Sequence, residues 1–238
     1  MSNNKEEQKL ISFDYALTRS LCNEANYDIL EGFLNELFDY SVKVKNVVKN
    51  GRVKEKYNRV EMLVENKKGD PIMVELYFSA EVDCLLQMLY SSNQILVEYA
   101  DVKSWTCTLR KVISIYIDCL NWQEGSDYVY RNSMTFSDIH SKEEVELDAL
   151  QWCRYKKKKP TEICPEYYIL QIKNFDDVVE DKLDEWVYFF KHNNIKDEFT
   201  AKGLDKVRKV LLYENLTPEE QAEYDHLQEI RLYENDEV

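Results

Sequence analysis

The stretch Tyr57–Ser79 most constrains the fold of this chain, because its pattern is typical of a β-hairpin. Apolar residues recur at every second position on both sides of a turn-forming segment, residues 66–70, which is the period of a half-buried strand. These apolar residues are Val60, Met62, Val64, Ile72, Val74 and Leu76. A turn centred on Lys68 places Val60 opposite Leu76, so one face of the hairpin is wholly apolar.

The other face of the hairpin sets two carboxylates against each other. The same register places Glu61 opposite Glu75, and it places Arg59 opposite Tyr77 and diagonal to Glu75. Directly opposed side chains lie about 5 Å apart at Cβ, where like charges are destabilising unless a positive charge offsets them. Two sources of positive charge are open at this point: a bound divalent cation, or the Arg59 guanidinium on a face that meets solvent.

The composition predicts a folded cytoplasmic protein. Of the 238 residues, 44% are hydrophobic and 13% aromatic, which is enough to fill a sizeable core. Six cysteines lack C-x-x-C spacing and mostly lie beside apolar residues, as buried free thiols do in a reducing compartment. No run of about 18 apolar residues and no signal-peptide pattern occurs, so we expect no membrane association. The five glycines form no phosphate-binding loop, so we expect no nucleotide cofactor.

The charge of the chain is unevenly distributed. The formal net charge is −14, which disfavours a nucleic-acid partner, yet residues 43–59 carry many basic side chains. Lys43, Lys45 and Arg59 could contact phosphates there, because screening confines the influence of exposed charges to about 10 Å. The simpler interpretation is a solvated strand edge, and for a second basic run, residues 154–159, a solvated loop.

Hydrophobic periodicity predicts an α/β core with a helical end. The first part reads, in order, as a helix over 27–38, a strand over 42–48, the two hairpin strands, a helix over 80–99 and a strand over 111–120. On the helix over 80–99, we expect Val82, Leu85, Leu86, Leu89 and Tyr90 to face inward. The strand over 111–120 is nearly continuously apolar, which predicts burial on both faces.

The second half of the chain turns from strands to helices. Strands are predicted over 127–136 and 167–172, and helices over 178–192 and 203–213. A last helix begins after Thr217, where Thr217, Pro218 and Glu220 match a capping box with proline in the first turn.

Four stretches carry a resemblance to a known superfamily. They are Asp14-Tyr15, the hairpin ending in VELYFS, LRKVISIYIDCLN at residues 109–121, and YYILQIKNF at residues 167–175, the last followed by Trp186 and Phe190. The tail over 213–227 adds to them. Together with the order of elements, these stretches resemble the PD-(D/E)xK nucleases, and within them the branch of recombination-promoting nucleases and transposase-like proteins.

The resemblance implies a fold and a set of site residues. The fold is a restriction-endonuclease-like mixed sheet core over residues 10–175 with a helical C-terminal tail over 176–238. In such enzymes acids on the second and third strands bind Mg²⁺, and the residue two positions after the third-strand acid positions the attacking water. The matching residues are Glu61 and Glu75 as ligands of Mg²⁺, or of Mn²⁺, and Tyr77 in the third place. Lys43, Lys45 and Arg59 would contact the DNA backbone.

Three positions depart from the family pattern, and two functions are open. The family usually carries Asp in place of Glu61, Lys or Gln in place of Tyr77, and often Lys in place of Thr18. In the first interpretation the chain is a metal-dependent endodeoxyribonuclease, a hydrolase with a role in DNA recombination, and a homodimer would suit double-strand cleavage. In the second, catalysis has lapsed and the fold is a DNA-binding or protein-interaction module.

A third interpretation is an adaptor whose acidic helical tail binds a basic partner. Its sequence feature is the apolar stripe of Leu204, Val207, Val210 and Leu211 within residues 203–213. Such a stripe more often packs against its own core.

Overall fold

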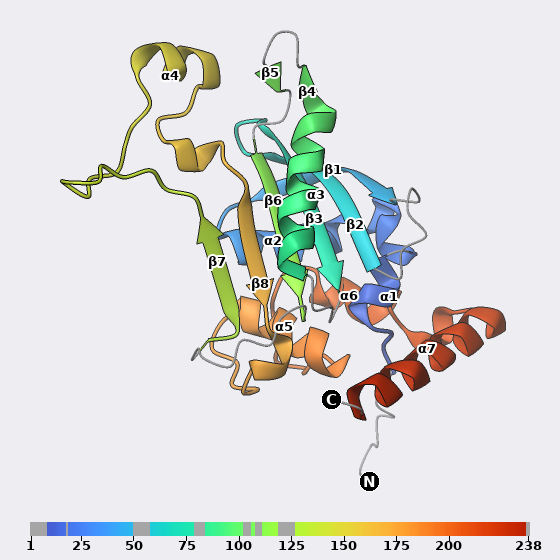
Figure 1. Ribbon diagram of the computed structural model, residues 1–238. Helices are drawn as coiled ribbons and strands as arrows, with labels where there is room; N and C mark the ends of the chain where they lie inside the picture. The colour runs from blue at the N-terminus through green and yellow to red at the C-terminus, as the bar shows by residue number, and fades with distance from the viewer. Residues whose placement is uncertain are drawn as a thin grey trace. The chain divides into compact units, whose positions relative to one another are not determined.

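The computed structural model describes residues 9–17, 19–49, 58–78, 84–101, 106–107, 111–118 and 127–236 (Figure 1). Thr18, Tyr57 and the basic residues of 52–56 lie outside the described residues. The chain divides into two compact units: Met1–Leu37 with Asp177–Val238, and Phe38–Asp176.

The second unit is built on a six-stranded mixed sheet (Figure 1). Its strands, in spatial order, are β1 (Val42–Lys49), β2 (Asn58–Asn66), β3 (Pro71–Phe78), β6 (Lys111–Ile117), β8 (Glu166–Leu170) and β7 (Val129–Ser133). The first three form an antiparallel meander, β6 is parallel to β3 and to β8, and β7 is antiparallel to β8. A separate two-stranded ribbon pairs β4 (Ala100–Asp101) with β5 (Thr106–Cys107). The expected α/β class with a mixed sheet is therefore confirmed.

The hairpin register is confirmed residue by residue. Val60 pairs with Leu76, and Glu61 pairs with Glu75. The turn is held by Asn66, whose side-chain oxygen accepts hydrogen bonds from the backbone N–H of Lys68 (2.8 Å) and Asp70 (3.0 Å). This Asx-type bonding is one reason why asparagine favours turns. The alternating apolar residues of the hairpin are buried, as their period predicts.

The helix α3 (Cys84–Tyr99) lies across the face of the sheet that carries Glu61 and Glu75 (Figure 1). Met88 packs against Tyr77 and Tyr116, and Ile95 packs against Met73 and Val112. The strand β6 is buried on both faces, as expected.

The prediction for the inner face of α3 is wrong. Leu85, Leu86, Leu89 and Tyr90 are exposed, and the buried residues of α3 include two serines. Val82 lies outside the described residues. The physical reason is that Ser91 and Ser92 turn inward to bond groups of the sheet, Glu75 and Tyr167 respectively. Hydrophobic periodicity alone predicts a helix rotated so that the leucines are buried and the serines are exposed.

A long, exposed connection joins β7 to β8. Almost every residue between 134 and 156 is exposed, and the segment contains α4 (Ala149–Tyr155), a helix absent from the sequence prediction. The second basic run lies here and is partly neutralised, because Lys157 pairs with Asp70 (2.8 Å) and Lys159 pairs with Glu144.

The first unit is helical. Its α-helices are α1 (Phe13–Leu17), α2 (Tyr27–Phe38), α5 (Lys182–His192), α6 (Leu204–Val210) and α7 (Pro218–Asp236). The short 3₁₀ turns among the described residues of both units are η1 (Ser20–Cys22), η2 (Glu24–Asn26), η3 (Pro160–Glu162), η4 (Ile172–Asn174) and η5 (Tyr213–Asn215). The core of this unit is aromatic, with Phe13, Trp186 and Phe189 in edge contact.

The expected start of the last helix is confirmed. The Glu220 carboxylate accepts a hydrogen bond from the Thr217 N–H (2.9 Å), and the Thr217 hydroxyl accepts one from the Glu220 N–H (3.3 Å). The predicted apolar stripe over 203–213 packs mainly inside the protein: Leu204, Val207 and Leu211 are buried, and Val210 is half-buried.

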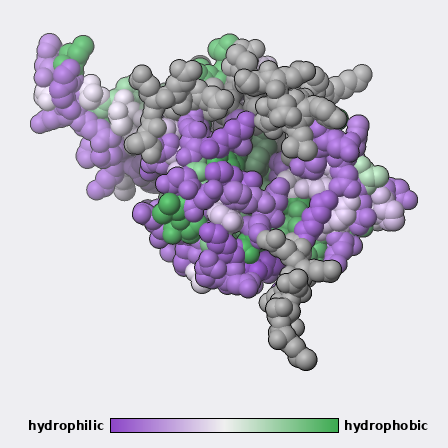
Figure 2. Space-filling view, turned by 90° about the horizontal axis from the view of Figure 1, so that it is seen from below, coloured by the Kyte–Doolittle hydropathy of each residue, from purple (hydrophilic) through white to green (hydrophobic). Residues whose placement is uncertain are grey.

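The described surface is mainly polar on one side. Figure 2 shows hydrophilic residues predominating on the face seen from below, with hydrophobic residues in small separate groups. None of the helices in the described part of the chain combines the length and apolar content needed to span a membrane.

Candidate functional site: a carboxylate pair under helix α3

The two carboxylates predicted from the hairpin lie together on the sheet face beneath α3. Glu61 comes from the middle of β2 and Glu75 from the middle of β3, as directly paired residues. Both are buried: Glu61 is 8% exposed and Glu75 is 0% exposed. The site therefore differs from a solvated strand face, where carboxylates need no fixed partner.

Glu75 is satisfied by four neighbours. Its Oε2 accepts hydrogen bonds from Arg59 Nη2 (3.2 Å), from the Tyr77 hydroxyl (2.8 Å) and from Ser91 of α3. Its Oε1 accepts a hydrogen bond from the Ser114 hydroxyl on β6 (3.1 Å). A buried carboxylate is tolerable only with such partners, because burial of an unpaired charge costs several kcal/mol.

Arg59 links the two carboxylates. Its Nη2 lies 2.5 Å from Glu61 Oε1 and 3.2 Å from Glu75 Oε2, and its side chain is 14% exposed. The sequence left open whether a bound cation or Arg59 offsets the charge of the two carboxylates. In the structure, the Arg59 guanidinium contacts both of them. Charge-assisted bonds of this kind are among the strongest in proteins.

The phenols of the site remain neutral. Burial, and then the nearby charge of Glu75, hold the pKa of Tyr77 far above its usual range. The pKa of Tyr116 is raised by the same two causes. Burial alone would lower the pKa of Arg59, but the surrounding phenol and carboxylate groups outweigh it and raise the pKa. Tyr77 can therefore donate a hydrogen bond, but it is not a base at neutral pH.

The polar centre is enclosed by rings and apolar side chains. The rings of Tyr77 and Tyr116 stack with centroids 4.4 Å apart and planes 10° apart. The Arg59 guanidinium carbon lies 5.1 Å from the centroid of the Tyr77 ring, within the range of a cation–π contact. Met88 and Ile169 close the cluster.

The arrangement does not fit a Mg²⁺ ion. Mg²⁺ requires about six oxygen ligands at 2.0 to 2.1 Å in octahedral geometry. Here the guanidinium lies between the two acids, and the oxygens of Glu75 already accept hydrogen bonds from four groups. Among the side chains that the structure describes, no cluster of three or more His, Cys, Asp or Glu occurs to hold an ion. A metal at this site would have to displace Arg59.

The lysines predicted to contact DNA lie toward the far end of the hairpin. Lys43 pairs across β1 and β2 with Glu65, four residues and therefore about 13 Å along the strand from Glu61. Lys45 is in an ion pair with Glu65 (3.0 Å). Arg59 is committed to the two carboxylates. The sequence thus identified the pairing of Glu61 and Glu75, whereas the predicted Lys43 and Lys45 lie away from this pair.

Three residues of the site were missed. Ser91, Ser114 and Tyr116 all contribute polar atoms or rings from elements that read as apolar. The signal was available: single polar residues in otherwise apolar segments, such as the serine of KVISIYI, are buried beside a polar partner more often than in an apolar core.

A second buried carboxylate lies on the opposite face of the sheet. Glu166 is next to Ile113 in the parallel register and accepts hydrogen bonds from Arg131 and from the Tyr168 hydroxyl (2.9 Å). Lys111 forms an ion pair with it. Hydrogen bonds from these cations lower the pKa of Glu166 against the effect of its burial. This group is fully partnered and ties β6, β7 and β8 together.

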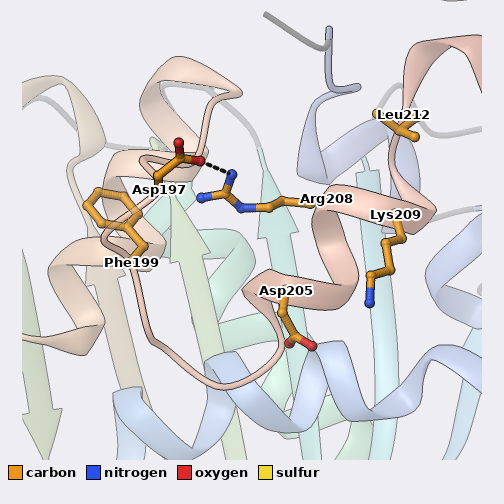
Figure 3. Close-up of a pocket in the computed structure, with 6 residues that line it drawn as sticks. All are labelled: Asp197, Phe199, Asp205, Arg208, Lys209 and Leu212. Atoms are coloured by element: carbon orange, nitrogen blue, oxygen red, sulfur yellow. Dashed lines mark hydrogen bonds and ion pairs between the residues drawn. The ribbon is translucent and has the colours of Figure 1, made fainter. Parts of the chain in front are cut away.

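The first unit contains an open hollow of about 560 Å³ (Figure 3). One of its two basic members, Arg208, points at Asp197 with an Nη1–Oδ1 distance of 3.0 Å and donates a second hydrogen bond to the carbonyl of Lys196. Asp205, Lys209, Phe199 and Leu212 complete the lining. The guanidinium is therefore already neutralised, and the hollow has no grouped catalytic residues.

Comparison with models of known protein families finds no match, and comparison with curated proteins finds no similar sequence. The site is therefore interpreted from its geometry.

Proposed function

We propose that this chain is a PD-(D/E)xK nuclease-fold protein that does not hydrolyse DNA and acts as an interaction module. One observation carries the proposal: Arg59 Nη2 lies within hydrogen-bonding distance of both Glu61 and Glu75. A fixed guanidinium takes the position that a bridging cation would need.

The order of elements supports the nuclease-fold part of the proposal. The chain passes through a helix (α2), an antiparallel three-stranded meander (β1 to β3), a second helix (α3) and, after the β4–β5 ribbon, a strand parallel to the third strand (β6). Acids stand on the second and third strands of the meander, as the resemblance implies. Fold alone does not give function, so the activity has to be argued from the site.

The chemistry of the site supports the loss of hydrolysis. A metal ion lowers the pKa of its bound water and stabilises charge on the phosphoryl oxygens. A guanidinium offsets the carboxylates but carries no exchangeable water, and Tyr77 supplies a neutral phenol where the family carries Lys or Gln. Glu75 is fully buried beneath α3, which leaves a phosphodiester no direct approach to it.

A Mg²⁺-dependent endonuclease is the second candidate, and the facing pair of Glu61 and Glu75 favours it. The test is to incubate the purified protein with supercoiled plasmid in Mg²⁺, in Mn²⁺ and in EDTA. A Glu75→Gln variant serves as the control, with circular dichroism to check that it folds. We expect no metal-dependent nicking by either protein. Nicking by the wild type that requires metal and disappears in the variant would establish the endonuclease and overturn the proposal.

Metal binding can be measured apart from cleavage. Arg59→Gln removes the positive charge from between the acids, so we expect this variant to bind Mn²⁺ more tightly than the wild type, measured by electron paramagnetic resonance of free Mn²⁺. Equal binding by the two proteins would show that Arg59 does not block a cation site.

A further inference from the structure

The outward face of α3 is apolar, although it is exposed. Five large side chains are between 51% and 72% exposed. They are Leu85, Leu86, Leu89, Tyr90 and Val97. Exposed apolar residues scattered singly are ordinary, but here Leu85, Leu86, Leu89 and Tyr90 lie together on two turns of one helix, with Val97 beyond the exposed Asn93 and Gln94, and such a group marks an interaction surface.

The rotation of α3 is fixed by its buried side, so these residues cannot simply turn inward. Ser91 bonds to Glu75, and Ser92 lies 2.8 Å from the Tyr167 hydroxyl. Met88 and Ile95, one turn away on each side, are buried in the two apolar clusters of this sheet face. Rotating the helix would break the bonds of a buried carboxylate, which costs more than the exposed leucines gain.

The near absence of charge on the outward face of α3 limits the kind of partner that it can bind. Among the 16 residues of α3, Glu98 is the one charged residue. Nucleic acid and anionic membrane surfaces are recognised through Lys and Arg, which this helix does not contain. An apolar, nearly uncharged partner surface is required, and a second copy of the same face meets this requirement.

We infer that two copies of the chain dimerise through α3, packed antiparallel about a two-fold axis. The five exposed side chains offer on the order of 600 Å², which with the intervening polar residues approaches the ~800 Å² per partner of a standard interface. In a two-fold interface each residue meets a symmetric counterpart. An axis between Ser91 and Ser92 places Leu86 of one copy opposite Val97 of the other.

Sedimentation velocity of the full chain over a concentration series tests the inference. We expect the wild type to associate to twice its 28.4 kDa mass. Leu86→Glu should weaken association about 100-fold, because it buries an unpaired carboxylate against the apolar Val97 of the partner subunit. Leu150→Glu is the matched control, since Leu150 is also an exposed leucine, on α4 (82% exposed, against 69% for Leu86).

A charge exchange tests the antiparallel register. Leu86→Lys and Val97→Glu should each dissociate the dimer, and the two combined in one chain should restore it, because each lysine then faces a glutamate of the partner subunit. Both positions are exposed in the single chain, so circular dichroism should show unchanged folding.

Three results would overturn the inference: a wild type that stays monomeric at every concentration, a Leu150→Glu protein that dissociates as readily as Leu86→Glu, or a Leu86→Glu protein that remains dimeric. The assay uses no DNA and no metal, so its outcome is separate from that of the plasmid experiment.

Discussion

Replacing Arg59 by methionine tests whether the guanidinium holds the carboxylate pair together. Methionine keeps much of the aliphatic volume but removes both contacts, the 2.5 Å contact to Glu61 and the 3.2 Å contact to Glu75. Two buried carboxylates would then face each other with only hydroxyl donors around Glu75. Removing one partner of a buried ion pair costs about 3 to 5 kcal/mol. Tyr77, Ser91 and Ser114 still donate hydrogen bonds to Glu75 in this variant. We therefore expect the free energy of unfolding to fall by about 3 kcal/mol.

The free energy of unfolding is measured by denaturation in guanidinium chloride, followed by far-ultraviolet circular dichroism. The matched control is Arg131→Met, because Arg131 also pairs with a buried glutamate but is itself largely exposed. Glu166 retains Lys111 and Tyr168, so this control should cost below about 1 kcal/mol. The difference between the two variants shows whether the loss of stability comes from the contact of Arg59 with both carboxylates or from the removal of any arginine beside a buried glutamate.

A double-mutant cycle isolates the interaction. Glu75→Gln removes the charge that Arg59 neutralises while preserving the shape of the side chain. If Arg59 acts through Glu75, the double variant should be more stable than the sum of the single effects predicts, by roughly 2 kcal/mol. Additive effects, or a cost below about 1 kcal/mol for Arg59→Met alone, would refute the reasoning that Arg59 closes the site.

Two further predictions concern the backbone and the phenols. Gly32→Ala should lower the free energy of unfolding by at least about 3 kcal/mol, because an added Cβ would collide with the carbonyl oxygen of Lys202. Gly69→Ala has open space around the added Cβ and should lower it by about 1 kcal/mol, because Gly69 has a positive φ. Thermal unfolding of the two variants measures both effects. The pKa of Tyr77 is raised, so the stabilisation from its neutral phenol is complete below the unfolded value of about 10 and is lost as pH rises further. Ultraviolet titration should show the same phenolate signal for wild type and Tyr77→Phe up to about pH 10, and an extra titrating group in the wild type in this range would contradict the burial argument.

The parts of the fold with strong local signals could be predicted from the sequence. The helix over 27–38 has the bounds that its apolar spacing predicts. The hairpin register follows from strict alternation on both sides of one turn, since a one-residue slip would expose the whole apolar face. The capping box at Thr217 is another local signal, and it is likewise confirmed.

The rotation of α3 could not be predicted, because it depends on contacts distant in sequence. Hydrophobic periodicity predicts that the leucines of this helix are buried. The buried carboxylate of Glu75 requires hydrogen-bond donors, however, and Ser91 of the helix supplies one. The helix α4 was missed for a related reason: its residues are all exposed or nearly so, and no apolar period marks it. Its capping box, built by Asp148 and Gln151, was the available signal.

The carboxylate pair and the apolar face of α3 are linked by one residue. Glu75 sits at the centre of the sheet face, and its demand for donors draws in Ser91 from the helix and Arg59 from the neighbouring strand. The arginine contacts both acids, and the serine contributes to the helix rotation that leaves Leu86 and its neighbours outside. Glu75 is therefore constrained by the structure itself, because the bonds of Ser91 and Arg59 both depend on its carboxylate, while Ser92, Met88 and Ile95 hold the same rotation of the helix.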